Sequence, residues 1–331
     1  MISDVVNRHP KVLSLSEFFS FTGLEALSRK RLDGKAMWKL CSQQRQRLQS
    51  MLNRDKRISE IIYPFDAPQA RFSHRDVPPI SVTTLPHLTQ DFDGLYDELE
   101  PVIRARSTGN VADQYRFLFE WLCDRLGRDV WIERSGGSLM FGYNVIQHFP
   151  DARVVHLYRD GRDTAMSMSQ HHAFKMLLAT VRQLQRWGID LLNGDSIDIN
   201  APPAYSIVFR FALSLVSRFS NFDKMIDQEF DLEAYGDLWS RMILFGRAYL
   251  SALPADRFLA LRYEDVLDRP HEKLRELIEF IDPSLLDEAW LDEAVSILRP
   301  NPSKYLSLPA EMQSRLTQAC APGLDALGYA T

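Results

Sequence analysis

The most regular hydrophobic pattern in the chain lies at 111–126, where apolar side chains recur every third or fourth residue. These positions are Tyr115, Leu118, Phe119 and Leu122. Because this spacing places them along one side of an α-helix, the segment is predicted to be an amphipathic helix with a buried face. The apolar runs 130–133 and 154–158 are short and contain β-branched residues, which is typical of strands.

A predicted helix at 139–149 separates these two strands, and the order strand, helix, strand indicates that the strands pair in parallel. Further helices are predicted at about 162–192, 204–219 and 233–252, and a strand follows at 258–262. The alternation predicts the α/β class, with a Rossmann-like parallel sheet flanked by helices.

The first part of the chain is predicted to be mainly helical. Residues 1–9 carry apolar side chains at helical spacing before Pro10, and 24–62 is rich in Arg, Lys and Leu. The segment 63–90 holds five prolines, so it is predicted to be a loop or lid. Apart from lid or insert segments at about 63–90 and 170–230, we expect all of 1–331 to form a single domain, because α/β folds often reach this length as one unit.

The composition of the chain argues against several classes of binding partner. The net charge is −5, from 39 basic and 44 acidic residues, so we expect no nucleic-acid partner. The most apolar stretch, 203–219, is interrupted by Arg210 and Arg218, so we expect no membrane span. The N-terminus has no positively charged start followed by an apolar core, so we expect no signal peptide. The three cysteines are far apart and form no CxxC pair, which indicates a reducing cytoplasm and no metal site.

Residues 153–169 join an apolar run to an Arg-Asp-Gly-Arg-Asp turn and then to a helix. The free amides and the positive dipole end at the start of a helix favour an oxyanion. Arg159 and Arg162 can add fork-shaped donors, and Ser167 can add a hydroxyl. We therefore expect this turn to bind a phosphate or sulfate group.

Arg159 and Ser167, eight positions apart, resemble a motif of the sulfotransferases that use 3′-phosphoadenosine 5′-phosphosulfate (PAPS). In that family, an Arg at the end of a strand and a Ser eight positions later hold the 3′-phosphate of the cofactor. The stretch 261–267, LRYEDVL, followed by Pro270 and an amphipathic helix, is similar to the family's second recurrent stretch. The resemblance implies a P-loop-type fold, with PAPS as the co-substrate and no metal.

The resemblance also implies roles for residues later in the chain. Tyr263 would hydrogen-bond the adenine, the alternative being a buried tyrosine whose hydroxyl is satisfied within the protein. Lys304 lies where the family has its C-terminal cofactor loop and would approach the 3′-phosphate; the alternative is a surface lysine in a Pro-rich loop. We expect Glu264 and Asp265 to cap the next helix.

The start of the chain, His9-Pro10-Lys11-Val12 and then Glu17, resembles the family's continuation after its phosphosulfate-binding loop. That loop, with the pattern Gly-x-Arg-Ser-Gly-Thr-Thr, is absent here, so we expect the first strand and the loop to be missing from this chain; the alternative is a natural pseudoenzyme. In the carbohydrate and protein-tyrosine branches, a glutamate at this place takes the acceptor's proton. Glu17 is therefore the predicted general base, and the alternative is a surface glutamate before an aromatic cluster.

The segment 134–138, Arg-Ser-Gly-Gly-Ser, follows a strand, and we expect it to shape the acceptor pocket, with a direct cofactor contact as the alternative. The predicted function is transfer of a sulfuryl group from PAPS to a hydroxyl of a carbohydrate or another small molecule, in a bacterial protein. Two alternatives remain, an inactive nucleotide-binding homologue and a small-molecule kinase, although the sequence GxxxxGK[ST] that a P-loop kinase needs does not occur. Neither the acceptor nor the oligomeric state can be read from the residues.

Overall fold

The computed structural model describes residues 2–22, 27, 31–44, 46–54, 61–68, 70–193, 221–299 and 302–330. The chain divides into two compact units. The first comprises Met1–Ser138 and Asp287–Ile297, and the second comprises Leu139–Leu286 and Leu298–Thr331. The organisation of 1–331 as a single sulfotransferase-like domain stays a prediction.

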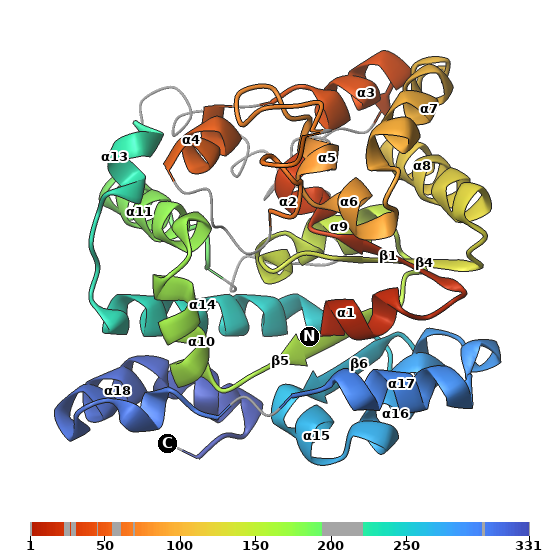
Figure 1. Cartoon of the computed structure of the whole chain (residues 1–331). Coiled ribbons are helices and arrows are strands. Elements are labelled where there is room, and N and C mark those ends of the chain that lie inside the picture. Colours follow the sequence, from red (N-terminus) through yellow and green to blue (C-terminus); the bar gives the residue numbers. More distant parts are fainter. Residues whose placement is uncertain are drawn as a thin grey trace. The chain divides into compact units, whose positions relative to one another are not determined.

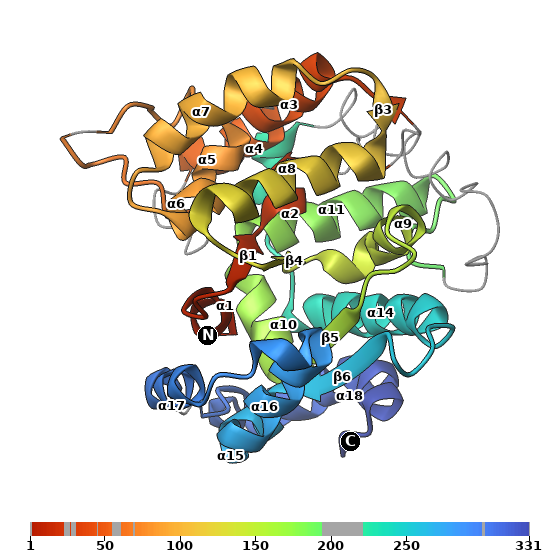
Figure 2. The same ribbon diagram turned by 90° about the vertical axis from the view of Figure 1, so that its right-hand side faces the viewer.

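A parallel pair of strands lies at the centre of the first unit (Figure 2). β1 (Val12–Ser16) pairs with β4 (Val130–Arg134), in a register that sets Ser16 opposite Arg134. All five residues of β1 are buried, which is typical of a parallel strand covered on both faces. Because the pairing is parallel, the carboxyl ends of both strands lie at one edge, where Glu17 and Ser135 follow.

Aromatic side chains form the core beside these strands. The helices α2 (Phe18–Thr22) and α8 (Val111–Leu126) contribute Phe18, Phe19, Tyr115 and Phe119, which are nearly inaccessible to solvent and meet edge to face or stacked. α8 has the predicted bounds because the Asn110 side chain caps its first turn and Gly127, in the left-handed conformation, ends it.

The other elements of the first unit are α1 (Ile2–Asn7), β2 (Arg31–Leu32), α3 (Gly34–Ser42), α4 (Gln46–Arg54), α5 (Pro79–Val82), α6 (Thr84–Leu88), α7 (Phe92–Arg104), β3 (Gly109–Asn110) and α17 (Glu288–Ile297). The Pro-rich segment differs from the predicted loop. Its residues Ile80, Val82 and Leu85 are buried within α5 and α6. Two short helices are possible there because Pro79 stands at the first position of α5, where no backbone N–H is needed.

The second unit is built around another parallel pair, β5 (Val154–Tyr158) and β6 (Phe258–Arg262), in which Tyr158 lies opposite Arg262. The predicted α/β class, with parallel strands flanked by helices, is thus confirmed in both units. The long helix α14 (Leu232–Leu250) contacts α10 (Gly161–Ser169) and α18 (Ala310–Leu327) (Figure 1). Gly161 permits this packing, because a β-carbon there would collide with the ring of Trp239.

The remaining elements of the second unit are α9 (Gly142–His148), α11 (His172–Arg186), α13 (Phe222–Ile226), α15 (Tyr263–Asp268), α16 (Pro270–Ile281) and the short 3-10 turns η4 (Pro283–Leu285) and η5 (Tyr305–Ser307). The single helix predicted at about 162–192 is two helices, since α10 ends at Ser169 and α11 begins at His172. The helix predicted at 204–219, within the 170–230 insert, falls in 194–220 and lies outside the described residues.

Cys41, Cys123 and Cys320 are free and buried. Burial raises the pKa of the Cys41 and Cys320 thiols to about 12, so both stay protonated near neutral pH. In the part of the chain that the structure describes, no helix is long and apolar enough to cross the bilayer. The same residues contain no group of three metal-ligating side chains.

Candidate functional site

The two sequence stretches singled out in the second unit emerge at neighbouring strand ends. β5 leads into Arg159 and β6 leads into Tyr263, and the parallel register places the last residues of both strands side by side. The guanidinium carbon of Arg159 lies 5.4 Å from the centre of the Tyr263 ring, within cation–π range. The carboxyl ends of parallel strands are where open α/β sheets bind ligands.

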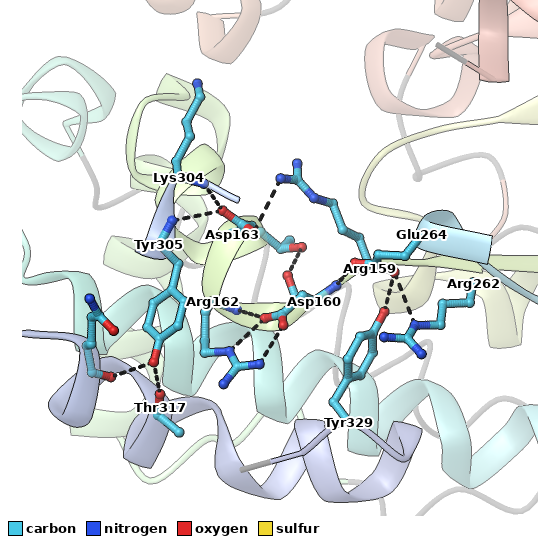
Figure 3. Close-up of polar contacts among 12 residues, drawn as sticks. Arg159, Asp160, Arg162, Asp163, Arg262, Glu264, Lys304, Tyr305, Thr317 and Tyr329 are labelled. Atoms are coloured by element: carbon cyan, nitrogen blue, oxygen red, sulfur yellow. Dashed lines mark hydrogen bonds and ion pairs between the residues drawn. The ribbon is translucent and has the colours of Figure 1, made fainter. Parts of the chain in front are cut away.

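Asp160 forms a hydrogen-bonded ion pair with Arg162 at the start of α10 (Figure 3). The Asp160 carboxylate accepts hydrogen bonds from Nε and Nη2 of Arg162 at 3.0 and 2.6 Å, and these bonds raise the pKa of Arg162. The same carboxylate accepts the backbone amide of Arg162 at 2.9 Å, so one of the amides that we expected to face an anion is already used. The Arg162 guanidinium also lies over the Tyr305 ring, 4.8 Å from its centre. Arg162 is therefore engaged within the protein.

Arg159 is held more loosely than Arg162. Its Nη2 lies 3.6 Å from the Asp163 carboxylate, one helical turn further on, and its side chain is 24% exposed. Asp163 itself is buried and accepts the backbone amides of Lys304 and Tyr305 at 2.8 and 3.0 Å. Among the described residues Arg159 has this one ion pair, so its other guanidinium N–H groups can still donate to an anion.

Ser167 and Lys304 lie beside this cluster. Ser167 is exposed on α10, one turn beyond Asp163, whereas Arg159 precedes the helix. The backbone of Lys304 binds Asp163, while its exposed side chain extends away from the other labelled residues in Figure 3. The structure thus brings together Arg159, Arg162, Tyr263 and the Lys304 backbone.

Glu264 and Asp265 do not cap the next helix, so that prediction is wrong. Neither Arg262 nor Arg269, the residues before α15 and α16, has a capping side-chain bond, and Glu264 turns elsewhere. Its Oε1 accepts the backbone amide of Asp160 at 3.0 Å, and its Oε2 accepts the hydroxyl of Tyr329 at 2.7 Å. Glu264 therefore joins the start of the Arg159 turn to the last turn after α18.

The sequence reasoning missed three residues that hold this cluster together, namely Asp163, Tyr305 and Tyr329. For Asp163 a signal was present, because it stands four positions after Arg159 and so on the same helical face. Tyr305 and Tyr329 carry no such signal, since each meets the turn only through the folded chain.

Glu17, the predicted general base, belongs to the first unit and directly follows β1. Its backbone has φ 52°, a left-handed conformation that a residue with a β-carbon rarely adopts. The surrounding chain holds it there, because its amide donates to the Arg134 carbonyl at 2.8 Å and its Oε1 accepts the Gly136 amide at 2.9 Å. Strained non-glycine residues of this kind cluster at functional sites.

Two charged residues at the end of β4 adjoin Glu17. Oε1 of Glu133 accepts the Ser135 hydroxyl at 2.6 Å and the Phe19 amide at 3.2 Å, and burial raises the pKa of Glu133 to about 7. The next residue, Arg134, has its Nε and Nη2 buried with no hydrogen-bond partner among the described residues. Burial lowers the pKa of Arg134, whereas the charges of Glu17 and Glu133 oppose that shift. The edge of the first sheet therefore combines carboxylates with a cation that can still bind an anion.

The raised pKa of Glu133 predicts a pH-dependent stability. Because the folded protein holds this proton up to about pH 7 while the unfolded chain releases it near 4.5, the stabilising contribution is full below about pH 4.5 and is lost as the pH rises through 7. Glu133→Gln keeps an acceptor oxygen without titrating. Urea unfolding at pH 5, 6, 7 and 8 should show the wild type losing stability relative to the variant, by at most about 1.4 kcal/mol per pH unit. Parallel pH curves for the two proteins would contradict the assignment.

Comparison with known proteins shows which protein family a part of the chain resembles. Residues 144–299 match the model of the sulfotransferase domain family. Among solved structures, the chain is similar to a sulfotransferase domain from the curacin biosynthetic pathway, with 15% sequence identity, a TM-score of 0.33 and coverage of 72% of this chain and 74% of that one. No curated protein matches the chain. The matched residues 144–299 include both the Arg159 turn and the Tyr263 stretch, so this part of the chain is similar to the sulfotransferase domain family.

Proposed function

We propose that this chain is a PAPS-dependent sulfotransferase that acts on a hydroxyl of a carbohydrate or another small molecule. The observation that carries the proposal is the meeting of Arg159 and Tyr263 at adjacent parallel strand ends, inside the segment that matches the family. The Arg159 guanidinium can donate hydrogen bonds to a phosphate, and the Tyr263 side chain beside it can contact a purine. Both belong to the nucleotide of PAPS.

Each predicted residue then has one task in holding the nucleotide. Arg159, before α10, and Ser167, on α10, bind the 3′-phosphate, and Tyr263 hydrogen-bonds the adenine. Arg162, paired with Asp160, contributes positive charge near the phosphate rather than a free fork. Lys304 lies on the loop that Asp163 ties to α10, so its exposed ammonium group can swing toward the same phosphate. These tasks account for the mixture of buried and exposed cations around the turn.

Glu17 serves as general base in the transfer. The acceptor oxygen forms a bond to sulfur while the bond from sulfur to the phosphate oxygen of PAPS breaks, so PAP, the desulfated nucleotide, leaves and the acceptor proton passes to Glu17. The Gly136 amide donates to Oε1 of Glu17 and so orients the carboxylate that takes the proton. No metal is required in this scheme, and the buried thiols suit a reducing bacterial cytoplasm.

Calorimetric titration of the chain with PAP and with ATP tests the proposal. We expect PAP to bind and ATP to bind more weakly, because only PAP carries a phosphate on the 3′-oxygen. Preference for ATP would favour a kinase, and binding of neither nucleotide would reject the proposal. PAP binding without transfer from PAPS to any of a panel of sugar and phenol acceptors would favour the inactive homologue.

A further inference from the structure

The end of α18 turns back toward the Arg159 turn. Gly328, with φ 74°, ends the helix in the left-handed conformation, and the amide of Tyr329 donates to the Leu324 carbonyl at 3.0 Å. This turn buries Tyr329, which is 7% exposed, against two side chains of the parallel strands. Its ring lies edge-on to Tyr158 at 6.1 Å, and the Arg262 guanidinium lies over it at 4.3 Å.

The hydroxyl of Tyr329 connects to the turn through one carboxylate (Figure 3). It donates to Oε2 of Glu264 at 2.7 Å, and Oε1 of the same group accepts the Asp160 amide at 3.0 Å. Burial and the neighbouring carboxylate raise the pKa of Tyr329 above its ordinary value, so the phenol stays protonated and remains a donor. The carboxylate is therefore held from both sides.

The Asp160 amide belongs to the peptide bond that follows Arg159. Because the peptide is planar, fixing this amide also fixes the carbonyl and the α-carbon of Arg159, from which its side chain extends. The Nε of Arg262 lies 3.4 Å from Oε2 of Glu264, so these two side chains form an ion pair. If Tyr329 did not hold it, Glu264 would be freer to rotate toward Arg159 and compete with an incoming phosphate.

We propose that Tyr329 is a positioning residue, which acts through Glu264 and the Asp160 amide to keep Arg159 directed at the 3′-phosphate. The inference rests on the proposed function, since it takes Arg159 to be the phosphate ligand. It assigns a specific task to the last turn of the chain, which has no contact with the transferred group in the proposed reaction. Tyr329 should therefore affect recognition of the 3′-phosphate and not that of the rest of the nucleotide.

The ratio of the affinities for PAP and for adenosine 5′-phosphate measures how well the protein recognises the 3′-phosphate. PAP and adenosine 5′-phosphate differ by the 3′-phosphate, so the ratio of their dissociation constants reports the contacts to that phosphate, including the one that Arg159 makes. Tyr329→Phe removes the hydroxyl and keeps the ring under Arg262. We expect the preference for PAP to fall about fivefold, as for loss of one hydrogen bond to a charged group acting indirectly, with the affinity for adenosine 5′-phosphate unchanged.

Tyr249→Phe is the matched control, because Tyr249 is another buried tyrosine of the same unit, and its hydroxyl donates to the Leu139 carbonyl instead. It should leave the ratio at the wild-type value. Glu264→Gln offers a second route if Tyr329→Phe does not fold, and it should also lower the ratio. A wild-type ratio in a folded variant overturns the inference alone, whereas a wild type that binds both nucleotides equally overturns the proposed function and the inference with it.

Discussion

Replacing Arg159 with alanine should weaken the binding of PAP by about 30- to 100-fold, the loss expected for a bidentate, charge-assisted contact with a phosphate. Arg159 is the cation at the strand ends whose partner, Asp163, lies at 3.6 Å and has two backbone donors of its own. Removing the guanidinium also takes away the positive charge between Asp163 and the incoming phosphate. The two negative groups then repel each other, which adds to the loss. Calorimetry with PAP measures the effect.

Two further variants separate the charge of Arg159 from its shape. Arg159→Lys keeps a positive charge but presents a single ammonium group, so it should recover part of the affinity and not all of it. Arg269→Ala is the matched control, because Arg269 is half exposed and pairs with Asp265 and Glu272 on the surface, where such pairs contribute little. If Arg159→Ala binds PAP as tightly as the control does, the turn is structural and the phosphate lies elsewhere.

Local sequence pattern predicts the elements of this fold well. The bounds of α8, β5 and β6 were predicted to the residue, because each rests on apolar periodicity and on flanking turn residues close in the sequence. The buried helices α5 and α6 were missed for the opposite reason. Their prolines indicate a loop, while the burial of Val82 and Leu85 depends on side chains distant in the sequence.

In the candidate site, too, some residues could be predicted from short motifs and others could not. Two short motifs predicted separately that Arg159 and Tyr263 contact the cofactor, and the parallel register of β5 and β6 explains why the two residues lie close together. The tasks of Glu264 and Tyr329 could not be predicted, since Tyr329 lies 65 positions beyond its partner and only the left-handed turn at Gly328 brings them together. Likewise, no sequence rule assigns a positive φ to Glu17.

Glu17→Gln should lower kcat by about 100-fold or more, the usual contribution of a positioned general base, while leaving the dissociation constant of PAP unchanged. Glutamine has the shape of glutamate, and its amide oxygen can still accept the Gly136 amide, so the left-handed backbone at position 17 should persist. What the variant loses is an oxygen that can take the acceptor's proton. Turnover is measured as release of PAP from PAPS with an acceptor, and binding by calorimetry.

Glu120→Gln supplies the matched control, because Glu120 is an exposed carboxylate on α8 in the same unit. It should turn over as the wild type does, which separates the loss of one negative charge from the loss of a base. Glu17→Asp, with one methylene fewer, retains a carboxylate but cannot reach both Gly136 and the acceptor, so its kcat should lie between those of wild type and Glu17→Gln. Full turnover in Glu17→Gln would mean that the strained glutamate serves the structure of the strand end and that another group, with Glu133 as the nearest carboxylate along β4, receives the proton.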